Sequence, residues 1–133
     1  MPAAVLVDSN VILDVATEDK AWFEWSSAAL EDAADSSILV INPIIYAEVS
    51  VRYATIEALE EALAGLRRDQ LPWEAGFLAG KAFLQYRRRG GVRAATLPEF
   101  YIGAHAAVAG MTLLTRDPRR YRTYFPSLEI IAP

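Results

Sequence analysis

Short apolar runs alternate along this chain with longer stretches in which apolar residues recur at helical spacing. The first run, AAVLV, ends directly in a carboxylate, and the later runs are similarly short and continuous. Continuous apolar runs of this length are typical of strands that are buried on both faces of a parallel sheet. They predict strands at 3–8, 38–41, 111–115 and 128–131.

The stretches between these runs predict helices. Asn42 followed by Pro43 is the pattern of a helix N-cap with proline in the first turn. Thr96 and Glu99 have the spacing of a capping box, and Gly110 is placed to end the helix that starts there. The expected helices cover 10–15, 19–35, 42–53, 55–68, 73–89 and 96–109, with a short helical turn after residue 118. Alternating strands and helices indicate an α/β sandwich around a mainly parallel central sheet.

Length and composition narrow the class of protein. With 133 residues, 53% of them hydrophobic, the chain is expected to form one domain over residues 1–133. It has no cysteine and one histidine, which argues against disulfides, a cysteine nucleophile and a multi-histidine zinc site. We see no basic signal-peptide start and no apolar run near the roughly 18 residues of a membrane span. A soluble cytoplasmic protein without a membrane partner is therefore expected.

Charge is distributed unevenly along the chain. Residues 1–66 contain 12 acidic and 2 basic side chains, a sum of −10, whereas residues 67–133 contain 5 acidic and 11 basic ones, a sum of +6. Every basic residue of the second part except Lys81 is arginine. An arginine-rich half can attract a phosphate backbone, although a solvated dipolar surface explains the same charges.

Four carboxylates are expected at one edge of the predicted sheet. Asp8 and Asp117 follow predicted strands, and the carboxyl ends of parallel strands form the usual ligand edge of such a fold. Glu48 and Glu99 lie near the starts of helices that can face the same edge. Clustered carboxylates repel one another unless cations intervene, and oxygen-only ligands suit Mg²⁺ or Mn²⁺. Such a site supports phosphodiester hydrolysis.

Each of these acids also has a purely structural explanation. Asp8 can cap the helix that it precedes, and Asp117 before Pro118 is a common turn or helix start. Glu99 can be the second member of the capping box with Thr96. Glu48 lies among apolar neighbours and needs a partner, for which Arg52, four residues on, is available.

Other polar and aromatic residues have weaker functional signals. Ser9 and Thr115 can hold metal-bound water or ligand, whereas Asp14 is expected to be a solvated acid. His105 lies in an apolar helix and is expected to pack. The aromatic residues Trp22, Phe23, Trp25 and Trp73 are assigned to the core or an interface. Arginines bracket two of the acids and can hold the phosphates of a bound strand: Arg87, Arg88, Arg89 and Arg93 before Glu99, and Arg116, Arg119, Arg120 and Arg122 around Asp117.

Four stretches together resemble the PIN-domain family, and within it the small VapC-type toxins of bacterial toxin–antitoxin pairs. They are VLVDSNVILD at 5–14, INPIIYAEVS at 41–50, TLPEFYIGAHAAVAG at 96–110 and LLTRDPRRYRTYFPSLEIIAP at 113–133. The resemblance implies a three-layer α/β/α sandwich and a Mg²⁺- or Mn²⁺-dependent endoribonuclease that a cognate antitoxin neutralises. It also implies a homodimer. The residues that it assigns to the metal are Asp8, Glu48, Glu99 and Asp117, with Asn10 and Thr115 in supporting positions.

One position departs from the pattern of this family. The third acid is usually aspartate in an LPDF-like motif, and Glu99 is longer by one methylene. Because metal-assisted chemistry depends on geometry at that scale, a second hypothesis stays open. In it the chain is a catalytically weakened domain that keeps the fold and binds RNA or an antitoxin. A phosphoacceptor domain is disfavoured because Asp8-Ser9-Asn10 lacks a carboxylate pair, and dinucleotide binding is disfavoured because no G-x-G-x-x-G motif follows a strand.

Overall fold

Five parallel strands form the central sheet of the computed structural model, which describes residues 3–133. Their order is β3-β2-β1-β4-β5, with Val5 opposite Leu39 and Val7 opposite Leu114. Every neighbouring pair is parallel, which confirms the predicted sheet type. The strands are β1 (Ala3–Val7), β2 (Ser37–Ile41), β3 (Arg67–Arg68), β4 (Thr112–Leu114) and β5 (Ile130–Ile131).

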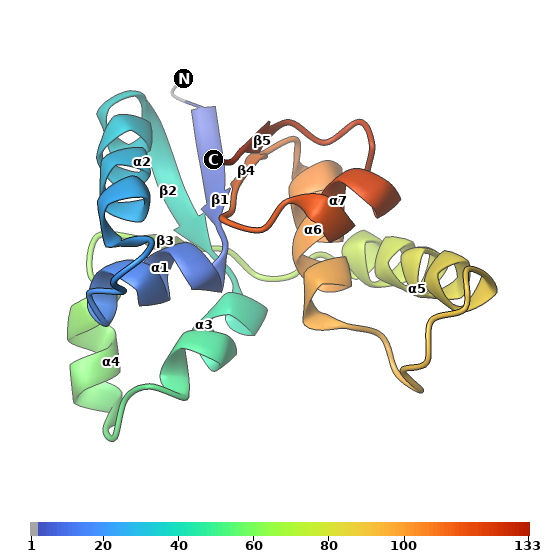
Figure 1. Cartoon of the computed structure of the whole chain (residues 1–133), viewed down its shortest axis with the longest axis horizontal. Coiled ribbons are helices and arrows are strands. Elements are labelled where there is room, and N and C mark those ends of the chain that lie inside the picture. Colours follow the sequence, from blue (N-terminus) through green and yellow to red (C-terminus); the bar gives the residue numbers. More distant parts are fainter. Residues whose placement is uncertain (1–2) are drawn as a thin grey trace.

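Helices cover both faces of this sheet, as the expected sandwich requires. The helices between β1 and β3 lie on one side of the sheet and those between β3 and β5 on the other (Figure 1). α3 lies at the carboxyl end of the sheet, where it contacts α6 (Figure 1). The helices are α1 (Ser9–Ala16), α2 (Phe23–Ser36), α3 (Pro43–Ser50), α4 (Ile56–Ala62), α5 (Trp73–Arg88), α6 (Pro98–Ala109) and α7 (Arg119–Tyr124).

Local capping explains several helix ends. The Asp8 carboxylate accepts a hydrogen bond from the Ser9 amide, and the Asn42 side chain accepts one from the Ile45 amide at 2.9 Å, with proline in the first turn of α3. Gly110 ends α6 with a left-handed φ of 68°, as its position in the sequence predicts.

Two predictions about local structure are wrong. The single helix expected over 55–68 stops at Ala62, because Gly65 adopts a φ of 88° and turns the chain into the short strand β3. The capping box is absent as well: Leu97 precedes α6 without a side-chain cap, and the Thr96 hydroxyl is buried without a hydrogen-bond partner within residues 3–133. Glu99 instead contacts Arg120, 21 residues away.

The core lies between the sheet and the helices, with Leu6, Val7 and Leu114 fully inaccessible to solvent. On one side α7 approaches α6 closely at Gly103. A Cβ atom at that position would lie 2.5 Å from the Phe125 ring and 3.1 Å from the Tyr121 ring. The missing side chain therefore lets α7 pack Tyr121 inward, toward the carboxyl end of β1. No helix within residues 3–133 is both long and apolar enough to cross a membrane.

Candidate active site

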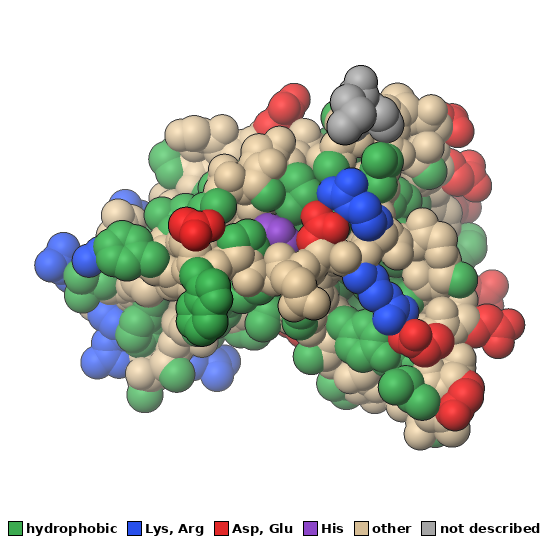
Figure 2. All heavy atoms as spheres, turned by 180° about the vertical axis from the view of Figure 1, so that it is seen from behind, with side chains coloured by type: hydrophobic (Ala, Val, Ile, Leu, Met, Phe, Trp, Pro, Cys, Tyr) green, Lys and Arg blue, Asp and Glu red, His purple; other side chains and the backbone are tan. Residues whose placement is uncertain are grey.

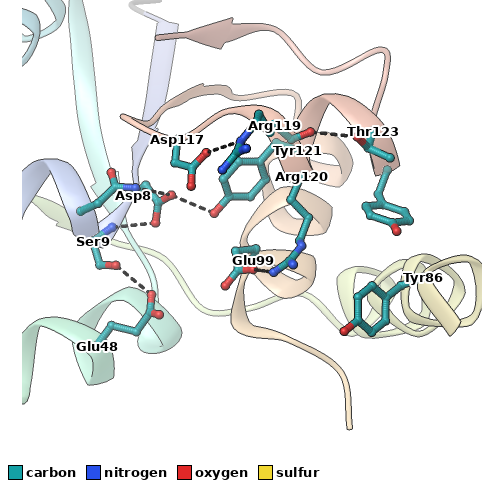
Figure 3. A pocket seen from close by; sticks show the side chains of 12 residues that line it. Asp8, Ser9, Glu48, Tyr86, Glu99, Asp117, Arg119, Arg120, Tyr121 and Thr123 are labelled. Carbon is teal, nitrogen blue, oxygen red and sulfur yellow. Dashed lines mark hydrogen bonds and ion pairs between the residues drawn. The ribbon is translucent and has the colours of Figure 1, made fainter. Parts of the chain in front are cut away.

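A hollow with a cavity volume of about 690 Å³ opens at the carboxyl ends of β1 and β4. All four acids that the sequence analysis singled out line it: Asp8, Glu48, Glu99 and Asp117. Figure 3 shows their carboxylates pointing into this shared space from four separate segments of the chain. The acids arrive from the end of β1, from α3, from the first turn of α6 and from the segment between β4 and α7.

Asp8 is the most strongly held of the four. Its side chain accepts hydrogen bonds from the Ser9 amide at 2.8 Å, from the Thr115 hydroxyl at 2.8 Å and from the Tyr121 hydroxyl at 2.9 Å. Burial raises the pKa of Asp8 above its ordinary value, while these hydrogen bonds act to lower it. Asp8 caps α1, as its structural explanation predicts, and it also presents a fixed carboxylate to the cavity.

Glu48 lies across the cavity from Asp8 and accepts a hydrogen bond from the Ser9 hydroxyl at 2.9 Å. Burial raises the pKa of Glu48, and repulsion from Asp8 and Glu99 raises it further. The structural alternative, an ion pair with Arg52 in the turn after α3, does not form among the described residues. A half-buried carboxylate with one hydroxyl donor therefore faces two other acids.

Glu99 and Asp117 meet arginines of α7. Arg120 donates a hydrogen bond to Glu99 at 2.6 Å, and Arg119 lies 3.6 Å from the Asp117 carboxylate. Both guanidinium groups belong to residues that line the same cavity. The cavity thus contains four carboxylates of which two are partly neutralised by cationic side chains from the neighbouring helix (Figure 3).

The donor chemistry of this cavity suits a hard divalent cation, because every candidate ligand is a carboxylate or hydroxyl oxygen. Repulsion from neighbouring acids contributes to the raised pKa values of Asp8 and Glu48, which is the electrostatic signature of a site that a cation would relieve. Within residues 3–133, however, no three acidic, histidine or cysteine side chains are already close enough together to hold a metal ion. The residue types are suitable ligands for such an ion, and their side chains would have to move closer together to bind it.

The two predicted supporting residues both lie beside Asp8. Thr115 is fully buried and donates to Asp8, while its oxygen accepts the Asp117 amide at 3.2 Å. The Asn10 side chain accepts the Arg116 amide at 3.1 Å and lies 3.4 Å from the Thr115 hydroxyl. These contacts tie the segment after β4 to the start of α1.

Of the eight arginines predicted to hold phosphates, six that are assigned to RNA binding occupy different surroundings. Arg119 lines the cavity, whereas Arg116 donates two hydrogen bonds to Asp14, at 2.8 and 3.0 Å, and lies over the Trp22 ring. The remaining four lie at the end of α5 and in the loop that follows it: Arg87, Arg88, Arg89 and Arg93. Figure 2, which shows the face opposite to that of Figure 1, has basic side chains gathered at the α5 end of the molecule and acidic ones at the far end.

Further expectations about single residues have mixed outcomes. Asp14, expected to be solvated, is 2% exposed and accepts a hydrogen bond from Ser26 in addition to those from Arg116. His105 packs as expected: it is buried and lies 3.0 Å from the Asn42 amide group. Trp73 is 93% exposed, which excludes the core and leaves an interface as its remaining assignment.

Tyr121 is the main residue of the site that sequence reasoning missed. It is buried, donates to Asp8, and has its pKa raised well above the ordinary value by burial and by the neighbouring Asp8 carboxylate. A signal was available, because Tyr121 follows Asp117 by four residues. That spacing is one helical turn, so the two side chains can project toward one site.

Comparison with known proteins identifies a family and several solved structures that are similar to this chain. The profile of the PIN domain family matches residues 5–126. No curated protein sequence matches the chain. Similar solved structures include VapBC2 from Rickettsia felis bound to a promoter DNA fragment (16% identity, TM-score 0.74, 98% of each chain covered) and VapBC-1 from nontypeable Haemophilus influenzae (16%, 0.74, 97% of each). A toxin–antitoxin complex from Klebsiella pneumoniae is also similar (19%, 0.69, 96% of this chain and 95% of the other).

These similarities to solved structures cover nearly the whole chain. At such low identity the solved structures show a common fold. The match to the family profile extends over more than half of the residues and includes all four cavity acids. The chain therefore belongs to the PIN-domain family.

Proposed function

We propose that this protein is a VapC-type toxin, an endoribonuclease that depends on Mg²⁺ or Mn²⁺. The observation that carries the proposal is the convergence of four carboxylates from four chain segments on one cavity at the carboxyl end of a parallel sheet. Membership of the PIN-domain family supports a nuclease, and the fold shared with structures of VapBC toxin–antitoxin complexes supports a toxin.

The proposed metal ligands are Asp8, Glu48, Glu99 and Asp117. A bound divalent cation would activate a water molecule and neutralise charge that develops on the phosphate. The chain's own residues prepare the site for this chemistry. Thr115, Tyr121 and the Ser9 amide fix the orientation of Asp8, and the Ser9 hydroxyl holds Glu48 beside it. Asn10 contacts Thr115 and Arg116 and so links the start of α1 to the segment that carries Asp117.

We assign RNA as the substrate on the basis of charge. The cavity floor is acidic, but its α7 wall presents Arg119, which is 90% exposed at the side chain and therefore free to meet a phosphate. The arginines at the end of α5 and in the loop that follows it, residues 87–89 and Arg93, add further positive charge for a bound strand. Arg116 is also among the proposed RNA-binding residues, although its guanidinium is engaged by Asp14 and only its remaining donors can reach a strand.

Metal removal is the direct test of this function. Purified protein is incubated with total bacterial RNA in Mg²⁺, in Mn²⁺ and in EDTA, and the fragments are resolved on a sequencing gel. We expect discrete fragments with either metal and intact RNA in EDTA, with activity restored when metal is added back. Cleavage that continues unchanged in EDTA would contradict a metal-dependent mechanism.

A second function, binding without catalysis, is favoured by one observation, the ion pair that Glu99 forms with Arg120. This glutamate stands where the family usually has aspartate, and its carboxylate is engaged by Arg120 at 2.6 Å. If that engagement persists, the domain binds RNA or an antitoxin without cutting. RNA binding of equal affinity in EDTA and in Mg²⁺, with no fragments in either, would favour this alternative over the nuclease.

For partners we propose a cognate antitoxin and a second copy of the chain, acting in the cytoplasm. Trp73 and Phe77, one turn apart on α5, are 93% and 71% exposed, which is unusual for a surface without a protein partner. Replacing both by serine should leave the fold intact because neither side chain is buried. Light scattering during size-exclusion chromatography is expected to show a dimer for the wild type and a monomer for the double variant; equal masses would contradict this interface.

A further inference from the structure

Arg120 already holds one of the carboxylates that the proposed metal site requires. Its Nη1 atom donates to Glu99 Oε2 at 2.6 Å and joins α7 to the first turn of α6. The guanidinium also lies over the Tyr86 ring, 5.7 Å from the ring centre, so it is held against the cavity wall (Figure 3). This arginine therefore lies between the acidic floor of the cavity and its aromatic side.

In the electrostatics of the cavity, Arg120 takes the place of a bound cation beside Glu99. Glu99 acts electrostatically on both Asp8 and Glu48, so its negative charge is felt across the site. The arginine supplies a positive charge on that carboxylate from within the same chain. A divalent cation on Glu99 would repel the guanidinium that donates to the same group, so the two positive charges disfavour each other.

The geometry of the other acids leads to the same conclusion. The described acidic side chains do not yet form a group of three that could hold an ion, although four of them line one cavity. Metal binding therefore needs side-chain movement, and movement of Glu99 toward Asp8 and Glu48 must either break its short contact with Arg120 or bring the guanidinium charge along. Asp117 is less restrained, because Arg119 lies 3.6 Å away and is largely exposed.

We propose that Arg120 competes with the divalent cation for Glu99, so that metal binding and release of this arginine are coupled. The inference rests on the proposed function, because it concerns the same metal site. Arg120 acts on the site through Glu99 and is a positioning residue. Its removal is expected to strengthen metal binding, whereas a residue that merely supports the structure of the site would weaken metal binding when removed.

The test measures Mn²⁺ affinity by isothermal titration calorimetry on protein freed of metal with EDTA. Arg120→Gln removes the charge and keeps most of the side chain that covers Tyr86. We expect it to bind Mn²⁺ about two- to fivefold more tightly than the wild type, the range expected for loss of a half-exposed ion pair. Arg122→Gln, on the exposed side of the same helix, is the matched control and should have wild-type affinity. Arg120→Lys keeps the charge and should also stay near wild type.

Further variants make the result decisive. In a Glu99→Gln background the Arg120→Gln change should alter affinity no further, because the shared carboxylate is gone. Arg120→Ala provides a second neutral variant if the glutamine protein folds poorly. Unchanged or weaker Mn²⁺ binding by the neutral variants, with binding abolished in Asp8→Asn, would overturn the competition and leave the nuclease proposal standing. No Mn²⁺ binding by the wild type or by any variant would overturn both.

Discussion

Asp8→Asn is expected to reduce metal-dependent RNA cleavage on the order of a thousandfold, because it removes one negative charge from the centre of the proposed metal site. Asp8 is the acid with the most fixed orientation, with donors from Ser9, Thr115 and Tyr121. Asparagine has nearly the same shape and keeps one oxygen as an acceptor. Cleavage rates at saturating Mg²⁺ measure the effect, with Asp35→Asn, an exposed acid on α2, as the control.

Urea unfolding at several pH values shows whether the Asp8→Asn variant is folded and tests the raised pKa of Asp8. The pKa of Asp8 is raised by burial above its ordinary value of 3.8, so the folded state keeps a proton that the unfolded chain has already lost. Stability conferred on the wild type by protonated Asp8 is therefore lost as pH rises through the folded pKa. Asp8→Asn does not ionise and should lack this loss when urea unfolding is compared at increasing pH above 3.8, the ordinary pKa of Asp8. A folded variant that cleaves RNA at the wild-type rate would contradict the role of Asp8.

Arg116→Ala is expected to lower the free energy of unfolding by about 3 kcal/mol, since it leaves a buried carboxylate without its cation. Asp14 is only 3% exposed at the side chain and would retain only the Ser26 hydroxyl as a donor. The same change also removes the guanidinium from the face of Trp22. Thermal unfolding should show a decrease in Tm of about 10 °C.

Arg119→Ala is the matched comparison for this second prediction. Arg119 is 90% exposed, so its removal should change stability by less than about 0.5 kcal/mol while it weakens RNA binding. Replacing Asp14 by leucine together with Arg116 by methionine should restore part of the lost stability, because no buried charge is left unpaired. An Arg116→Ala protein as stable as the wild type would instead favour a direct role of Arg116 in RNA binding.

The sheet was largely predictable because each central strand is a continuous apolar run, as AAVLV in β1 shows. β3 was not predictable from the sequence, because it consists of Arg67 and Arg68 at the edge of the sheet. Its pairing there depends on the backbone of β2. The end of α4 depends on one glycine conformation, at Gly65, inside a stretch of otherwise good helix formers. The local pattern of apolar residues thus predicts the apolar strands and fails for β3, the charged strand at one edge of the sheet.

The positions of the cavity acids were predictable for a similar reason, because the ends of parallel strands share one edge. Their partners were not predictable from the sequence. Asp14 and Arg116 are 102 residues apart, and Glu99 and Arg120 are joined only when α7 packs on α6. For Glu99, a long-range ion pair replaced the local capping contact that its spacing with Thr96 predicted. Tertiary packing decides which partner a side chain such as Glu99 takes. Gly103 is one of the residues that permits the close packing of α7 on α6.

The dispersed origin of the four carboxylates has a consequence for synthesis of the protein. The first acid is translated at residue 8 and the last at residue 117 of 133, and β4 between them inserts beside β1 in the middle of the sheet. A growing chain on the ribosome therefore lacks a complete cavity until residue 117 has emerged and β4 has paired beside β1. For a protein proposed to cut RNA, the order of strands itself postpones assembly of the site until the first and the last acid meet at one edge of the sheet.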